Sequence, residues 1–197
     1  MFKKVCIIGC GLIGSSIARA IRKQNLSAKI VSSNRSDLVN KKVFELKIVD
    51  DSNSDTKKMV EGSDLVIIAT PLSSYKDIIL KIKDSLKNKS ILTDVGSVKE
   101  NIINLIEKNV PKNVSWISSH PIAGTEESGP EAGLSDLFEN RWCILTPSKK
   151  VNNKDIKLLE TFWEKMGSKV DIMEAEQHDY ILSVSYTHLT LPTILLV

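Results

Sequence analysis

The chain has 197 residues, of which 42% are hydrophobic and 26% are charged, and its formal net charge is +3. These values are ordinary for a globular protein of one domain with part of a second, and they allow a sizeable core without disulfide bonds. The lysines are spread along the chain as solvated positions rather than gathered in one basic segment, which argues against nucleic acid as a partner.

Three cysteines, Cys6, Cys10 and Cys143, are scattered and have no metal-ligand spacing. We therefore expect free thiols, a reducing compartment and no metal site. The chain has no run of about 18 apolar residues, and its N-terminus leads into a strand-like segment rather than a signal peptide. These features argue against a membrane partner and make the cytoplasm the expected location.

Apolar segments of strand length alternate with amphipathic segments of helix length. This alternation predicts an α/β fold, a doubly wound, mostly parallel sheet of the Rossmann type. Continuous apolar runs such as Val5-Cys6-Ile7-Ile8 are expected when helices cover both faces of the sheet. The expected strands are Lys4–Ile8, Lys29–Ser32, Leu65–Ala69, Ser90–Thr93, Ser115–Ser118, Trp142–Leu145 and Lys169–Ile172, and the expected helices are Gly14–Arg22, Leu38–Leu46, Thr56–Val60, Ser74–Leu86, Lys99–Glu107 and Asp155–Met166.

A glycine-rich loop, Gly9-Cys10-Gly11-Leu12-Ile13-Gly14, joins the first expected strand to the first helix. In this context the G-x-G-x-x-G pattern predicts a dinucleotide site. Gly9 permits the tight turn, Gly11 admits the pyrophosphate close to the backbone, and Gly14 lets the helix pack on the strand. The helix N-terminus, with Leu12 and Ile13 in its first turn, offers free N–H groups to the phosphates. The alternative is a glycine-rich turn that binds nothing.

The second expected strand ends in Ser32-Ser33-Asn34-Arg35-Ser36, with no carboxylate where one usually binds the ribose hydroxyls of NAD. Ser33, Asn34 and Arg35 suit a 2′-phosphate, because a guanidinium can pair with it through two hydrogen bonds. The sequence therefore favours NADP as the cofactor and leaves NAD open. The alternative for Arg35 is a solvated residue at the start of the next helix.

Two further segments follow expected strands and so lie at the carboxyl edge of the sheet, where α/β proteins bind ligands. Thr70 and Pro71 follow the third expected strand, and we expect them to border the cofactor. Ser97 follows the fourth, where its hydroxyl can point into the crevice or cap the next helix.

A histidine follows the strand expected at Ser115–Ser118. His120 precedes Pro121, which restricts it to extended geometry, and Thr125 and Glu126 follow it closely. Imidazole is the side chain best suited to accept a hydroxyl proton near neutral pH. We therefore expect His120, on a short turn at the carboxyl edge, to be the proton acceptor. The alternative is a structural histidine.

The C-terminal residues divide into two parts. Residues 174–183 begin like a helix and contain His178, whereas residues 184–197, with His188, have neither a helical nor a strand period. Because residues 184–193 match the translation of a common sequencing adapter, we expect a non-native tail over 184–197, with an ordinary terminal segment as the alternative. The expected domains are then a dinucleotide-binding domain over 1–173 and the start of an all-helical domain over 174–183.

A combination of four segments is distinctive: Gly9–Gly14, Thr93–Lys99, Ser119–Gly129 and His178-Asp179. Together these segments resemble the prephenate/arogenate dehydrogenase family of tyrosine biosynthesis, and the His-Pro-Ile-Ala-Gly-Thr sequence is the most specific part of the likeness. The resemblance implies oxidative decarboxylation of prephenate to 4-hydroxyphenylpyruvate, or of arogenate to tyrosine, with NAD(P) as the cofactor. The sequence does not distinguish prephenate from arogenate.

The resemblance also implies roles for individual residues. His120 would bind and deprotonate the substrate's ring hydroxyl, Ser97 would hold the same hydroxyl or the nicotinamide, and Thr125 and Glu126 would line the substrate entrance. Family members continue into a helical domain that forms a homodimer and supplies an arginine for the substrate carboxylate. Because the residues after 183 depart from that pattern, we expect this chain to bind the cofactor but turn over substrate poorly. The homodimer is expected of the full-length family member.

Two other classes stay open on the residues alone. A beta-hydroxyacid dehydrogenase shares the two-domain plan but would use a lysine on the helical domain as its acid–base group. A non-catalytic NADP-binding module would need only the glycine loop, and His120, Ser97 and Thr125 at successive strand ends argue against it.

Overall fold

Residues 1–183 are described in the computed structural model, and residues 184–197, which include the expected tail and His188, lie outside the described residues. The strands are β1 (Phe2–Ile8), β2 (Ser27–Ser33), β3 (Asp51–Ser52), β4 (Leu65–Ile68), β5 (Ile91–Asp94), β6 (Ser115–Pro121), β7 (Trp142–Pro147) and β8 (Lys169–Ile172). The helices are α1 (Leu12–Lys23), α2 (Asp37–Glu45), α3 (Thr56–Val60), α4 (Tyr75–Ile82), α5 (Glu100–Glu107) and α6 (Asn153–Lys165), with short 3₁₀ turns η1 (Leu72–Ser74) and η2 (Lys83–Ser85).

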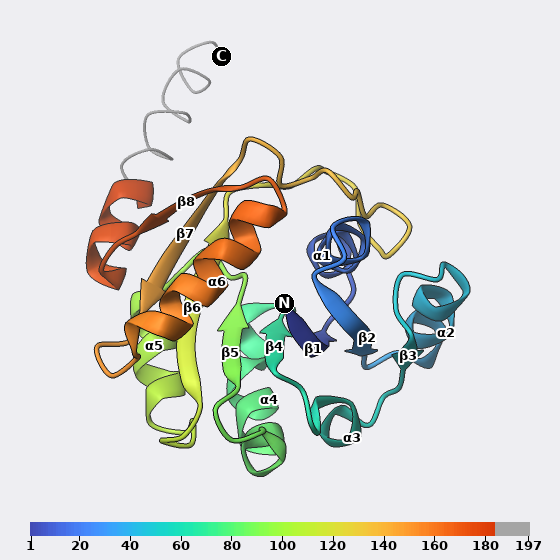
Figure 1. Cartoon of the computed structure of the whole chain (residues 1–197), viewed down its shortest axis with the longest axis horizontal. Coiled ribbons are helices and arrows are strands. Elements are labelled where there is room, and N and C mark those ends of the chain that lie inside the picture. Colours follow the sequence, from blue (N-terminus) through green and yellow to red (C-terminus); the bar gives the residue numbers. More distant parts are fainter. Residues whose placement is uncertain (184–197) are drawn as a thin grey trace, which may run out of the picture.

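The strands form one eight-stranded sheet in the order β3-β2-β1-β4-β5-β6-β7-β8 (Figure 1). All neighbouring strands are parallel except β6 and β7, which are antiparallel. The chain steps outward from β1 in one direction and from β4 in the other, so the strand order reverses between these two strands. The predicted doubly wound, mostly parallel Rossmann-type fold is confirmed, and the carboxyl ends of β1 and β4 are its expected ligand edge.

Helices cover both faces of the sheet, as the continuous apolar strands predict (Figure 1). Side chains alternate along β1, so that Val5 and Ile7 lie in the core beneath α1 and α6, whereas Cys6 and Ile8 lie in the core beneath α3, α4 and α5. The same alternation divides β4 between the two cores. Among the helices of residues 1–183, none is long and apolar enough to cross a membrane.

The structure differs from the sequence prediction at β6. The strand continues through His120 to Pro121, and β7 pairs with it so that His120 lies opposite Ile144. The prediction that His120 lies on a short turn after the strand is therefore wrong. The partner strand β7 comes from residues more than 20 positions away, and the local pattern around Pro121 carries no sign of it. The two-residue strand β3 was also not predicted.

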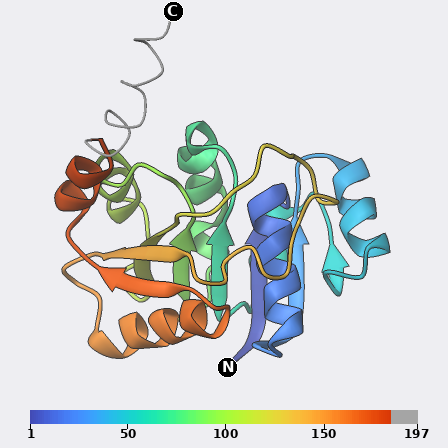
Figure 2. The ribbon, with the colours of Figure 1, turned by 90° about the horizontal axis from the view of Figure 1, so that it is seen from above.

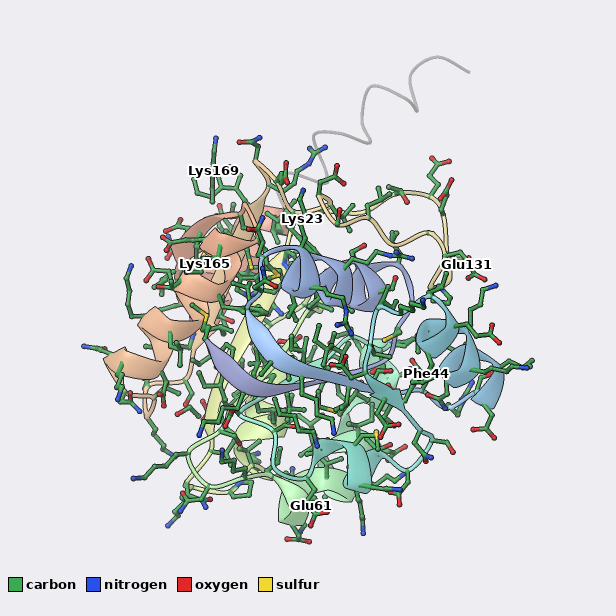
Figure 3. The ribbon with its side chains drawn as sticks, turned by 45° about the vertical axis from the view of Figure 1, so that its right-hand side comes forward. Lys23, Phe44, Glu61, Glu131, Lys165 and Lys169 are labelled. Carbon is green, nitrogen blue, oxygen red and sulfur yellow. The ribbon has the colours of Figure 1, made fainter. Side chains whose placement is uncertain are left out.

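The connection from β6 to β7, residues 122–141, crosses α1 and reaches α2 (Figure 2). The backbone N–H of Leu134 donates to Ser16 Oγ at 2.9 Å, and Lys42 of α2 pairs with Glu131 at 2.9 Å. Figure 3 shows Glu131 beside α2, near Phe44. The connection 122–141 therefore packs against α1, the helix that begins at the glycine loop.

Replacing Ile67 with alanine tests the core. Ile67 is fully buried in β4, so Ile67→Ala should lower the free energy of unfolding by about 2–5 kcal/mol. Leu38→Ala is the matched control, because Leu38 on α2 is 81% exposed and its loss should change stability by no more than about 0.5 kcal/mol. Denaturant unfolding measures both values, and equal losses would contradict the placement of β4 in the core.

Candidate active site

Each glycine of the loop between β1 and α1 occupies a distinct environment. Gly9 has a φ of +93°, and a Cβ there would lie 2.7 Å from the carbonyl oxygen of Ala69. A Cβ on Gly14 would lie 2.0 Å from the carbonyl oxygen of Gly9, whereas one on Gly11 would meet no atom within 4 Å. Gly9 and Gly14 are therefore required by the backbone and its packing, and Gly11 leaves open space in which a ligand can approach.

The N-terminus of α1 is left without a protein cap. Its N-cap residue is Gly11, no side chain of residues 1–183 caps the helix, and its first turn contains no acidic residue. The first N–H groups of an α-helix have no partner within the helix. Those of Leu12 and Ile13 are thus suited to bind phosphate oxygens, and the open space at Gly11 fits a dinucleotide pyrophosphate.

The last residue of β2, Ser33, and the next residue, Asn34, are buried, whereas Arg35 is exposed. Ser33 donates its hydroxyl to Thr56 Oγ1 at 3.0 Å. Asn34 accepts from the backbone N–H of Cys10 at 2.6 Å and donates to Asn40 Oδ1 at 3.0 Å. The carbonyl oxygen of Ser33 accepts from the N–H of Gly9 at 2.9 Å, so the backbone of Ser33 and the side chain of Asn34 both hold the glycine loop.

Arg35 is exposed and makes no ion pair within residues 1–183. Of the three residues predicted to bind a 2′-phosphate, Arg35 is the one whose charged group is free to meet a ligand.

Thr70 and Pro71 follow β4 beside the glycine loop. The methyl carbon of Thr70 is one of the atoms that a Cβ on Gly9 would meet, at 2.7 Å, and its hydroxyl accepts from Ser74 at 2.8 Å. Pro71 is exposed. The structure thus brings the predicted cofactor-bordering residues next to the loop, although β4 ends at Ile68 rather than at Ala69.

A buried ion pair lies at the carboxyl end of β5. Asp94 and Lys99 are both fully buried, and the Nζ atom of Lys99 lies 3.1 Å from the nearer carboxylate oxygen of Asp94. Lys99 Nζ also donates to the carbonyl oxygen of Ser119 at 2.6 Å, and Asp94 accepts from the hydroxyl of Ser118 and from the N–H of Ser119. These bonds fix Ser118 and Ser119, the residues of β6 immediately before His120.

His120 belongs to a line of three side chains. Its Nδ1 atom lies 2.9 Å from Nε2 of His178, and Nδ1 of His178 lies 2.7 Å from a carboxylate oxygen of Asp179. His178 and Asp179 belong to the helical residues 175–183, which follow β8. Asp179 also accepts from the backbone N–H groups of Lys99 and Glu100, so its carboxylate caps α5.

The environment keeps the two imidazoles neutral. Burial, the Lys99 ammonium and the neighbouring His178 lower the pKa of His120 to about 4. Burial also lowers the pKa of His178. Burial alone would raise the pKa of Asp179, but hydrogen bonds from Glu100, His178 and Lys99 bring it below its ordinary value. At neutral pH His120 is therefore an uncharged proton acceptor beside an ionised carboxylate.

The other predicted site residues lie on exposed segments. Ser97 is exposed and does not cap α5, because the N-cap residue is Lys99 and the capping carboxylate comes from Asp179. Thr125 and Glu126 are exposed in the connection that follows β6. Their segments leave β5 and β6, which are neighbouring strands, at the same edge of the sheet.

Sequence analysis assigned no role to Asp94, Lys99, His178 and Asp179. All four lie in the segments that carry the family resemblance, Thr93–Lys99 and His178-Asp179, and that was the available signal. Nothing local shows that a lysine is fully buried. Among residues 1–183, no group of three or more His, Cys, Asp or Glu side chains is arranged to hold a metal ion.

A cavity of about 1240 Å³ lies at the opposite edge of the sheet, lined by Phe2, Trp116 and several lysines. It contains none of the predicted site residues. We place the active site at the carboxyl edge because the glycine loop and the buried imidazole lie there.

Known proteins resemble this chain in both sequence and structure. Residues 17–172 match the family model of the prephenate dehydrogenase nucleotide-binding domain. The chain is 34% identical over 185 residues to the cyclohexadienyl dehydrogenase of Zymomonas mobilis, covering 94% of this chain and 63% of that protein, and 30% identical to the prephenate dehydrogenase of Bacillus subtilis, covering 91% and 49%. The chain thus spans about half to two thirds of the length of these relatives.

A solved structure is similar over nearly the whole chain. The prephenate dehydrogenase from Aquifex aeolicus, in complex with hydroxyphenyl propionate and NAD⁺, superposes with a TM-score of 0.86 at 30% identity. The match covers 97% of this chain and 69% of that one. The similarity therefore extends over nearly all of this chain and about two thirds of the solved one.

Substituting the glycines of the loop separates packing from ligand approach. Gly14→Ala should destabilise the fold, because its Cβ would overlap a carbonyl oxygen that cannot move freely. Gly11→Ala should leave the unfolding midpoint nearly unchanged and weaken cofactor binding, because its Cβ enters open space above the N-terminus of α1. Thermal unfolding and calorimetric titration with NAD⁺ and NADP⁺ measure the two effects, and equal unfolding midpoints for the two variants would contradict this assignment.

Proposed function

The chain belongs to the prephenate dehydrogenase family, and from this premise we propose that the protein oxidatively decarboxylates prephenate to 4-hydroxyphenylpyruvate with a nicotinamide cofactor. The observation that supports the proposal best is the position of His120. Its buried, neutral imidazole lies at the same edge of the sheet as the glycine loop and the N-terminus of α1. Arogenate is the alternative substrate. The three buried free thiols are compatible with a cytoplasmic location.

His120 would accept the proton of the substrate's ring hydroxyl. When bound, a nicotinamide cofactor would supply the acceptor for the hydride that leaves the carbon bearing this hydroxyl. His120 completes the oxidation by taking the proton, and the carboxylate on the ring departs as carbon dioxide, leaving its electron pair to the ring, which becomes aromatic. The protein therefore needs to orient the two reactants and hold an unprotonated imidazole at the hydroxyl.

The remaining predicted residues complete this proposal. Ser97 would hold the hydroxyl or the nicotinamide, and Thr125 and Glu126 would line the entrance for the substrate. Both segments are exposed and leave the strands next to His120. An arginine for the substrate carboxylate and a homodimer interface would come from a helical domain in the longer protein.

The cofactor is a nicotinamide dinucleotide, and we propose that NADP binds in preference to NAD. Gly9, Gly11 and Gly14 shape the loop, and the N–H groups of Leu12 and Ile13 would bind the pyrophosphate. Arg35 supports the NADP assignment, because its guanidinium is exposed just after β2 and makes no ion pair with the residues that the structure describes. Ser33 and Asn34 would act by bracing the loop, and Thr70 and Pro71 by bordering the cofactor.

Replacing Arg35 tests the choice of cofactor. Arg35→Ala should weaken NADP⁺ binding by about 1.5–3 kcal/mol, because a charge-assisted hydrogen bond to phosphate is lost. NAD⁺, which has no 2′-phosphate, should bind with little change. Calorimetric titration of residues 1–197 measures both affinities. Arg22→Ala is the matched control, since Arg22 is paired with Asp50, and an equal loss for both cofactors in Arg35→Ala would contradict NADP selection.

Replacing His120 tests the proton acceptor. In a chimera that joins residues 1–183 to the C-terminal part of the Zymomonas mobilis relative, His120→Asn should lower kcat by roughly 10²–10⁴ and leave cofactor affinity unchanged. Cofactor reduction with prephenate, arogenate and a 3-hydroxy acid identifies the substrate. Turnover of the hydroxy acid alone would overturn the proposed reaction, and unchanged kcat would make His120 structural.

A further inference from the structure

In the line of side chains His120, His178 and Asp179, the donor and the acceptor of each hydrogen bond can be assigned. Asp179 accepts from the backbone N–H groups of Lys99 and Glu100 at 3.0 Å. These bonds and the lowered pKa keep its carboxylate ionised, so that it can only accept. The Nδ1 atom of His178, 2.7 Å away, must therefore carry the proton of that hydrogen bond.

The proton on Nδ1 of His178 determines the next hydrogen bond. A neutral imidazole carries one proton, so Nε2 of His178 is a lone-pair acceptor. Nδ1 of His120 lies 2.9 Å from this acceptor and must donate to it. His120 is then protonated on Nδ1, and its Nε2 atom is the unprotonated one. Nε2 makes no hydrogen bond within residues 1–183 and is not among their buried polar atoms that lack a partner.

The opposite arrangement is disfavoured by the same contacts. If His178 were protonated on Nε2 alone, its Nδ1 lone pair would face the ionised carboxylate of Asp179 at 2.7 Å. If His178 carried both protons, a cation would be fully buried near the Lys99 ammonium. Among the charged groups that face the pair, Asp94 is already engaged by Lys99, and Asp179 is held by α5.

We propose that His178 and Asp179 are positioning residues that hold His120 in its Nδ1–H tautomer, so that Nε2 is the atom that accepts the substrate's hydroxyl proton. The inference rests on the proposed function for the identity of the proton donor. The tautomer itself is a property of the protein alone. A second consequence is that the residues after β8 determine the tautomer of His120 in β6, because Asp179 binds both His178 and the N-terminus of α5.

The tautomer can be measured directly in the 197-residue chain. The chain has three histidines, so ¹⁵N-histidine labelling gives a simple long-range ¹H–¹⁵N spectrum, and His188→Gln identifies the third ring. His120 should show a protonated Nδ1 and an unprotonated Nε2 at neutral pH. An unmodified chain with His120 protonated on Nε2, or with His178 doubly protonated, would overturn the proposal.

Two variants test the cause of this tautomer. Asp179→Asn places an amide N–H beside Nδ1 of His178, so that Nδ1 can become the acceptor and the ring proton of His178 can move to Nε2. Nε2 of His178 then donates to Nδ1 of His120, and His120 should change to the Nε2–H tautomer. His178→Phe removes the acceptor and should reduce the ratio of Nδ1–H to Nε2–H in His120 by about tenfold. A tautomer unchanged in both variants would show that His178 and Asp179 do not set it.

Asp55→Asn is the matched control. Asp55 also caps a helix, α3, through the N–H of Lys58, but it lies in a different part of the fold. Its replacement should leave the His120 spectrum unchanged. This control separates the effect of the hydrogen bond between Asp179 and His178 from the effect of losing a helix cap. In the chimera described above, Asp179→Asn should lower kcat and leave the KM for cofactor unchanged. Lack of turnover by the unmodified chimera would contradict the proposed function while leaving the tautomer result intact.

Discussion

The buried carboxylate of Asp94 is the group on which the arrangement of the site depends. It ends β5, has no exposure to solvent, and accepts hydrogen bonds from Lys99, Ser118 and Ser119. A charge in such a position is tolerated only when it is paired and hydrogen-bonded, and removing one partner of a buried pair typically costs about 3–5 kcal/mol. Ser118 and Ser119 of β6 are therefore held in one position relative to β5, and His120 is the next residue of the strand.

Lys99 connects this buried pair to the segment after the sheet. Its ammonium binds Asp94 and the carbonyl oxygen of Ser119, while its backbone N–H binds Asp179. One residue thus fixes both the strand that carries His120 and the helical segment that carries His178. The positive charge of Lys99 also helps to lower the pKa of His120, so the same contact that orders the site favours an unprotonated imidazole.

The parts of the molecule that sequence predicted well depend on short-range spacing. The apolar strands, their order of alternation with helices and the glycine loop follow from residues close in the chain. The burial of His120 in β6 and its contact with His178 do not, because they depend on residues 24 and 58 positions away. Asn34 is a further case: the amide suggested a ligand contact, yet its side chain is taken up by Cys10 and Asn40.

The two halves of the site have different structural requirements. The glycine loop is braced by Asn34 and closed by Gly14, and its contacts come from β1, β2, α2 and the turn after β4. The ring of His120 is instead held by His178, which is bound by Asp179, and both lie beyond the last strand. The contacts that shape the glycine loop therefore do not include the segment after β8, whereas those that orient His120 do. Because Asp179 binds both the N-terminus of α5 and His178, the docking of that segment on α5 is linked to the orientation of the His120 ring.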